Sequence, residues 1–141
     1  MVYRLALSYT KSRQDAEDVC QATFLKLIEH NNEIQDGKER AWLASVAANQ
    51  CRDLLKSFWR RNIEPLSEEL EFETSEESDV FRSAMALRPK ERVVLYLYYY
   101  EGFSTAEIAG MLSITQSAVT TRLGRARKIL RNSLEVAANE V

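Results

Sequence analysis

The sequence predicts an all-α protein made of two small helical units joined by a flexible acidic linker. The chain of 141 residues contains only four glycines and two prolines, which favours long helices over a fold with many turns. Its apolar residues, 45% of the total, recur at helical spacing. Residues 63–80 contain a proline, eight acids and no base, and lack such a period. We therefore predict units at 1–61 and 80–137, with the linker at 62–79.

The N-terminal unit is predicted to begin with the end of a helix over residues 1–11, which is too short for its buried face to be assigned. Ser12 and Asp15 then have the spacing of a helix N-cap. The apolar residues that follow keep a 3.6-residue period as far as His30. They are Ala16, Val19, Cys20, Phe24, Leu27 and Ile28. His30, the only histidine, is better explained as the end of this helix than as a chemical group.

A third helix is predicted from Ala41 to about Trp59, after a loop at 31–38. Its predicted apolar face is Trp42, Leu43, Val46, Ala47, Gln50 and Leu54. A second set of residues recurs at steps of three or four and forms what we call the polar stripe: Asn49, Arg52, Asp53, Lys56 and Arg60. Together with the aromatic and basic cluster Phe58–Arg61, this pattern suits the holding of single-stranded DNA. A solvated helix face is the competing interpretation.

The C-terminal unit is predicted to begin with a short amphipathic helix at 81–87, and Pro89 opens the next helix. The dense apolar and aromatic run from Val93 to Tyr100 is expected to pack as core rather than to stack on bases. Ser104 and Glu107 have the spacing of a capping box and mark a further helix start. A turn at 113–115, with its threonine as N-cap, then leads to a last helix from Gln116.

The last helix has two contrasting faces. Val119, Leu123, Ala126 and Leu130 form a packing face. The opposite side, which we call the recognition face, is small, polar and cationic: Ser117, Thr120, Thr121, Gly124, Arg125 and Lys128. Residues 122–131 include five bases and no acid, which suits contact with phosphates and guanine edges. The pattern predicts a DNA-binding helix-turn-helix, with an ordinary helical hairpin as the alternative.

Gly124 strengthens the DNA-binding interpretation. A glycine inside an exposed helix costs about 1 kcal/mol relative to alanine. Its place on the recognition face indicates that something bulky, such as a DNA backbone or base, approaches closely there.

The net charge of −2 is unusual for a nucleic-acid binder, but the charge is unevenly distributed. Residues 81–141 carry nine Lys or Arg against five Asp or Glu, so the basic end is masked by the acidic middle. Cys20 and Cys51 are isolated, and we expect no disulfide, metal site or cofactor. The sequence contains no recognisable catalytic constellation, signal peptide or membrane-spanning run, so we expect a cytoplasmic protein that is not an enzyme.

Three segments in this order resemble the extracytoplasmic-function group of sigma-70-type sigma factors. They are DAEDVCQATFLKLIEH, ERAWLASVAANQCRDLLKSFWRR and LRPKERVVLYLYYYEGFSTAEIAGMLSITQSAVTTRLGRARKIL. The resemblance covers nearly the whole chain. It implies a subunit that binds bacterial RNA polymerase core and directs initiation at particular promoters, with an anti-sigma factor as a further partner.

The resemblance also implies a role for each surface. The candidate polymerase contacts are Asp15, Glu17, Asp18, Gln21 and Phe24. The candidate contacts to the −10 promoter element are Asn49, Arg52, Lys56 and Arg60, with the preceding loop 34–40 capturing an unstacked base. The candidate −35 contacts are Gln116, Ser117, Thr120, Thr121, Arg122, Gly124, Arg125 and Lys128. The acidic linker is implied to run through the polymerase channel that later carries RNA.

The chain departs from the family pattern in places. Relatives have a further helical turn or more before Val2, which makes Met1 a candidate truncated or alternative start. Thr120 and Gly124 replace longer side chains, so the −35 sequence preference cannot be assigned. A stand-alone helix-turn-helix regulator remains the alternative function. It would bind palindromic DNA as a dimer. A protein-interaction module with an incidental basic face would show no DNA dependence.

Overall fold

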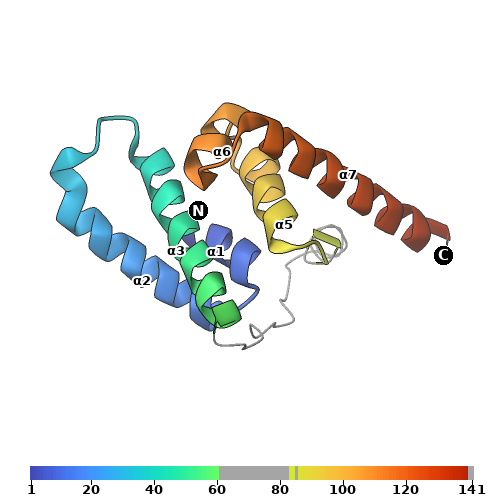
Figure 1. The fold of residues 1–141 in the computed structure, drawn as a ribbon, viewed down its shortest axis with the longest axis horizontal. Helices are drawn as coiled ribbons and strands as arrows, with labels where there is room; N and C mark the ends of the chain where they lie inside the picture. The colour runs from blue at the N-terminus through green and yellow to red at the C-terminus, as the bar shows by residue number, and fades with distance from the viewer. Residues whose placement is uncertain (61–82, 85, 140–141) are drawn as a thin grey trace.

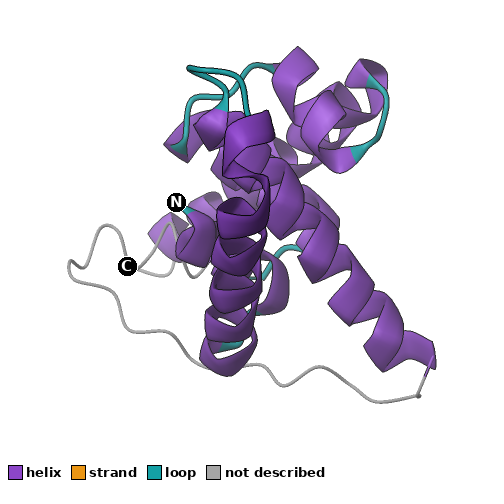
Figure 2. Ribbon diagram, turned by 90° about the vertical axis from the view of Figure 1, so that its left-hand side faces the viewer, coloured by secondary structure: helices purple, strands orange, loops and turns teal. Residues whose placement is uncertain are grey.

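The computed structural model describes residues 1–60, 83, 84 and 86–139. These residues form helices joined by short loops, with no strand among them (Figure 1, Figure 2). The predicted all-α class is therefore confirmed. The predicted linker at 62–79 lies outside the described residues. So do parts of the helix predicted at 81–87, in which Ser83 and Ala84 are helical and Leu87 is buried.

The N-terminal unit consists of α1 (Val2–Thr10), α2 (Arg13–His30), a 3-10 turn η1 (Asn31–Glu33) and α3 (Glu39–Arg60). The chain reverses between α1 and α2 at Lys11, which takes a left-handed conformation with φ of 53°. The Ser12 side chain then accepts a hydrogen bond from the backbone N–H of Asp15 at 3.2 Å. This bond confirms the predicted N-cap of α2.

The C-terminal unit consists of α5 (Pro89–Leu95), a π-helical turn η2 (Tyr96–Tyr100), α6 (Thr105–Leu112) and α7 (Gln116–Asn139). Pro89 lies in the first turn of α5 as predicted. Gly102 has φ of 75°, which only glycine adopts readily, and so allows the bend between η2 and α6. In Figure 1, α7 projects away from the rest of the molecule.

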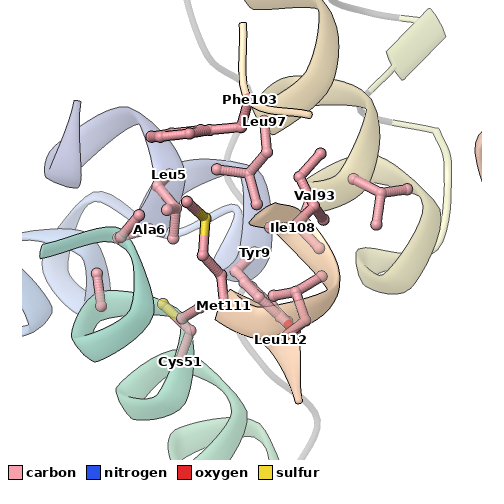
Figure 3. Close-up of a cluster of buried hydrophobic side chains, with 14 of the residues drawn as sticks. Leu5, Ala6, Tyr9, Cys51, Val93, Leu97, Phe103, Ile108, Met111 and Leu112 are labelled. Carbon is pink, nitrogen blue, oxygen red and sulfur yellow. The ribbon is translucent and has the colours of Figure 1, made fainter. Parts of the chain in front are cut away.

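The two units share one hydrophobic core, a feature that the sequence did not predict. Figure 3 shows side chains of α1 and α3 in the same cluster as those of α5, η2 and α6. α1 lies at the centre and packs on α2, α3 and α5. Its Leu5 and Ala6 are fully buried. The short first helix therefore connects the cores of both units.

The predicted apolar face of α2 is wrong over its second half. Ala16 and Val19 are buried, but Phe24 is 47% exposed and Ile28 is 75% exposed. The physical reason is that α1, with 9 residues, is half as long as α2, with 18. The second half of α2 extends beyond it toward the η1 loop (Figure 1).

The predicted apolar face of α3 also needs correction. Its fully buried residues are Ala44, Ala47, Ala48 and Cys51. The larger predicted residues Trp42, Leu43, Val46, Gln50 and Leu54 are only half-buried. Small side chains allow α3 to approach both α1 and α6, which it contacts on this side.

The aromatic run before α6 is core only in part. Val93, Val94 and Leu97 are fully buried, as predicted for a segment that supports the helix-turn-helix. Tyr99 and Tyr100 are instead 57% and 50% exposed.

Candidate nucleic-acid interface

The helix-turn-helix is held by local hydrogen bonds that the sequence predicted. The Ser104 side chain accepts from the Glu107 N–H at 3.1 Å, and the Glu107 carboxylate accepts from the Ser104 N–H at 3.0 Å. α6 ends at Leu112, and its C-cap residue Ser113 has a left-handed conformation with φ of 55°. The Thr115 hydroxyl then accepts from the Ala118 N–H at 3.1 Å. These caps fix the angle at which α7 leaves α6.

The packing face of α7 is buried as expected. Val119 and Ala126 are fully buried, Leu123 is 2% exposed, and Leu130 is half-buried. These residues pack α7 on α5 and α6. One side of α7 therefore anchors it, and the other remains available.

All six residues of the recognition face are exposed. Within the described part of the chain, Arg125 and Lys128 make no hydrogen bond or ion pair. A Cβ built on Gly124 would meet no atom within 4 Å. Nothing within the described fold therefore requires glycine there, which leaves the prediction of a close external approach in place.

Three predicted −35 contacts have partners or positions of their own. The Gln116 amide donates to the Thr105 hydroxyl at 2.8 Å, linking the starts of α6 and α7. The Thr120 hydroxyl donates to the Gln116 carbonyl at 3.1 Å. Arg122 is half-buried. Burial raises the pKa of Tyr9 to about 12, and the charges of Arg52 and Arg122 oppose that rise. Arg122 thus lies at the edge of the recognition face.

Arg127 is a basic residue of α7 that turns away from the recognition face. Its guanidinium lies 5.9 Å from the ring centre of Tyr98 and 5.3 Å from that of Tyr99, and it donates to the Tyr99 hydroxyl. It therefore stabilises the packing of α7 on η2.

The polar stripe of α3 is less exposed than the recognition face, and some of its side chains are hydrogen-bonded within the chain. Asn49, Asp53, Lys56 and Arg60 are exposed, but Arg52 is half-buried. The Arg52 Nη1 donates to the Leu112 carbonyl of α6 at 2.5 Å, and its Nη2 donates to the Asn49 side-chain oxygen. The side chains of Trp59 and Arg61, part of the predicted aromatic and basic cluster, lie outside the described residues. Two members of the stripe are thus already hydrogen-bonded.

The first turn of α3 also contacts the C-terminal unit. The Arg40 guanidinium lies 4.3 Å from the ring centre of Phe103 and donates to the Glu101 carbonyl at 2.7 Å. It also pairs with the Glu101 carboxylate. The predicted base-capturing loop 34–40 is wrong at its end, because Glu39 and Arg40 already belong to α3, and Arg40 is bound to the turn before α6.

The predicted polymerase surface on α2 combines acids with exposed apolar side chains. Glu17, Asp18 and Gln21 are exposed, and Asp15 is half-buried beside the N-cap. Sequence reasoning missed Leu25, which is 61% exposed, and gave Ile28 only as part of the apolar stripe of this helix. With Phe24, these residues form a contiguous apolar patch at helical spacing, a feature typical of protein-binding surfaces. The signal in the sequence was an apolar stripe longer than α1 could cover.

Within the described ranges, the structure shows no cluster of three or more His, Cys, Asp or Glu suited to a metal ion. Those ranges also include no helix of sufficient length and apolar character to cross a membrane. The sulfhydryl groups of Cys20 and Cys51 are free, and burial raises the pKa of Cys51 to about 12.

Comparison with known protein families gives two matches. The Sigma-70 region 2 family matches residues 1–61, and the Sigma-70 region 4 family matches residues 82–130. Among solved structures, the sigma factor RpoE in complex with the anti-sigma factor NepR from Bartonella quintana shares the fold. Its TM-score is 0.83 at 21% identity, and the match covers 96% of this chain and 90% of RpoE. CnrH in complex with the cytosolic domain of CnrY gives a TM-score of 0.66 at 27% identity, covering 96% and 80%.

Curated relatives extend this likeness. The chain is 28% identical to ECF RNA polymerase sigma factor SigE of Mycolicibacterium smegmatis, and 29% to the probable RNA polymerase sigma factor RfaY of Xanthomonas campestris. These matches cover 99% and 94% of this chain but only 59% and 37% of those relatives. It is 32% identical to ECF RNA polymerase sigma factor SigL of Mycobacterium tuberculosis, covering 96% of this chain and 83% of SigL. With both units matched in order, the chain belongs to the ECF RNA polymerase sigma factors.

Proposed function

We propose that this chain is a dissociable promoter-specificity subunit, which binds bacterial RNA polymerase core and directs initiation through −10 and −35 contacts. The observation that carries the proposal is the recognition face of α7, where every residue is exposed on a capped helix-turn-helix. A helix presented in this way fits the major groove of DNA, and its bases suit phosphate and guanine contacts. The subunit catalyses no step itself and acts in the cytoplasm with the polymerase.

Each surface has a distinct proposed role. The recognition face, with Gln116 and Arg122 at its edges, binds the −35 element. Asn49, Arg52, Lys56 and Arg60 on α3 bind and help to open the −10 element. The acids and the apolar patch of α2 dock on polymerase core. The proposed domain limits are 1–61 and 80–137, around the linker at 62–79.

An anti-sigma factor is a further proposed partner. The solved structures of RpoE and CnrH hold these proteins with NepR and with the cytosolic domain of CnrY, respectively. This chain has the same fold and exposes the apolar patch of α2 and the basic recognition face of α7. A comparable partner could therefore make both apolar and charged contacts with it.

The decisive experiment is run-off transcription with purified bacterial core polymerase on a promoter library, with and without this chain. Initiation at a discrete subset of promoters only when the chain is present supports the proposal and reports both element preferences. No initiation and no core binding, together with tight salt-sensitive binding to a palindrome by a dimer, would support a stand-alone regulator instead.

Asn49→Ala separates promoter opening from promoter binding. The amide lies on the exposed side of α3, suited to an unstacked base. We expect about a fivefold slower formation of the open complex, equivalent to one lost hydrogen bond of about 1 kcal/mol. Closed-complex affinity should change less. Permanganate footprinting and gel-shift titration measure the two steps, and an equal loss in both would argue against a role in opening.

A further inference from the structure

Two arginines occupy reciprocal positions where the two units meet. Arg92 of α5 is 4% exposed, and its guanidinium donates to the Ser8 carbonyl and, at 3.0 Å, to the Tyr9 carbonyl. Both carbonyls belong to the last turn of α1. In the opposite direction, Arg52 of α3 donates to Leu112, the last residue of α6. Each unit therefore binds the C-terminus of a helix in the other.

The arrangement is favourable because the last carbonyls of a helix have no partner within that helix. They also carry the negative end of the helix dipole, which attracts a cation. Burial lowers the pKa of Arg92 to about 10, so its charge persists at neutral pH. A third bond, to the Leu87 carbonyl at 2.7 Å, holds its side chain within the C-terminal unit.

The edge of the same interface has a second charged contact. Arg40, in the first turn of α3, pairs with Glu101, which follows η2. Tyr96 donates its hydroxyl hydrogen to the same carboxylate. Burial tends to raise the pKa of Glu101, but the bonds from Tyr96 and Arg40 outweigh it and hold the pKa below its usual value. Glu101 thus stays ionised and bound to the N-terminal unit at neutral pH.

These contacts use the surfaces of the two units unequally. Arg52 belongs to the polar stripe, and Arg40 lies in the first turn of the same helix. The recognition face of α7 contributes nothing to the interface and is exposed. Closure therefore occupies Arg52, one of the residues proposed for the −10 element, and leaves the recognition face available.

We propose that Arg92 and Arg52 form a reciprocal latch that keeps the free chain closed and withholds Arg52 of the polar stripe from single-stranded DNA until the two units separate. This inference rests on the proposed −10 role of the stripe. A ligand that binds only the open form has its apparent affinity reduced by the open fraction. Separation of the units would remove that penalty and free Arg52 at the same time.

Small-angle X-ray scattering of the full chain tests closure without DNA or polymerase. One compact body of this length has a radius of gyration of about 15 Å. Arg92→Gln removes the charge and leaves buried helix carbonyls unpaired, so we expect a rise of about 3 Å or more as the units separate. Arg92→Lys keeps the charge without the fork of donors and should give an intermediate value. Arg131→Gln, at an exposed site on α7, is the matched control.

Because Arg92 is buried, its replacement could unfold a unit, which circular dichroism would reveal. Glu101→Gln provides an independent route, since it weakens the Arg40 contact at the edge of the interface. Its matched control is Glu29→Gln on α2, where the side chain is 69% exposed.

Fluorescence anisotropy with a random-sequence single-stranded oligonucleotide tests whether closure withholds Arg52 from DNA. Loss of a cation ordinarily weakens binding to nucleic acid, as Arg131→Gln should show. Arg92→Gln should instead bind about threefold or more tightly than the unaltered chain. Glu101→Gln should gain more than Glu29→Gln, which reports the general effect of losing an acid.

Unchanged scattering for Arg92→Gln and Glu101→Gln would overturn the latch. A larger radius of gyration without tighter binding to the oligonucleotide would overturn the withholding of Arg52. Failure of the proposed function would be seen separately, as absence of initiation with core polymerase while scattering still reports opening.

Discussion

The recognition face of α7 and the polar stripe of α3 are predicted to do similar work, but the fold treats them differently. The residues of the recognition face are exposed, and its arginine and lysine are unbonded within the described chain. The polar stripe is exposed except at Arg52, which binds both α6 and Asn49. The difference arises because α7 packs through one side, on α5 and α6, whereas α3 is in contact with α1, α2 and α6. A polar helix face is therefore free for a partner only when no neighbour lies against it.

The largest expected effect concerns the buried side of α7. Leu123→Ala removes a side chain that is 2% exposed, and we expect a loss of about 2–5 kcal/mol in the free energy of unfolding. Ile129→Ala is the control on the same helix, where the side chain is 41% exposed and the loss should stay within about 0.5 kcal/mol. Urea titration followed by circular dichroism measures both. Similar losses would show that the two sides of α7 are not distinct.

Next in size is the effect on the recognition face itself. Arg125→Ala should cost about 1–3 kcal/mol of promoter binding, or roughly tenfold in initiation, on a promoter that depends on its −35 element. Folding stability should not change, since the side chain is exposed. Run-off transcription measures the effect, with Arg131→Ala as a control further along α7. Undiminished initiation would remove Arg125 from the interface.

A smaller effect separates Arg52 from its neighbour in the polar stripe. Arg52→Ala should lower the free energy of unfolding by about 1 kcal/mol, because the Leu112 carbonyl loses its donor. Lys56→Ala, at an exposed position one turn later, should change it by less than about 0.5 kcal/mol. Thermal unfolding measures both variants. Equal losses in the free energy of unfolding would contradict the difference between Arg52 and Lys56.

The smallest effect, at Gly124, has opposite signs in two assays. Alanine there meets open space, so Gly124→Ala should stabilise α7 by about 0.5–1 kcal/mol through helix propensity. Initiation on a −35-dependent promoter should nevertheless fall by about twofold, because the added methyl group blocks a close approach. Unfolding and run-off assays on one preparation measure both. A gain in both would contradict the close-approach interpretation.

Local signals in the sequence were sufficient for the helix limits and for α7. Ser12, Ser104 and Thr115 each accept the backbone hydrogen bond that their spacing predicts. Such bonds depend on residues three apart, so the sequence alone determines them. The packing face of α7 was also predictable, because the helix is amphipathic over residues 116–130 and packs there through one side.

The tertiary structure alone decided the burial of α1, the exposed end of α2 and the use of Arg52. Periodicity identifies an apolar stripe but does not show how far a neighbouring helix covers it, and the stripe of α2 continues to Phe24 and Ile28, which are exposed. The contact of Arg52 with Leu112 joins residues 60 positions apart, beyond the reach of any local pattern. The sequence by itself determined which helices form and which family they belong to. The shared core and the contact between the two units depend on how close-packed surfaces fit together, which only the folded chain specifies.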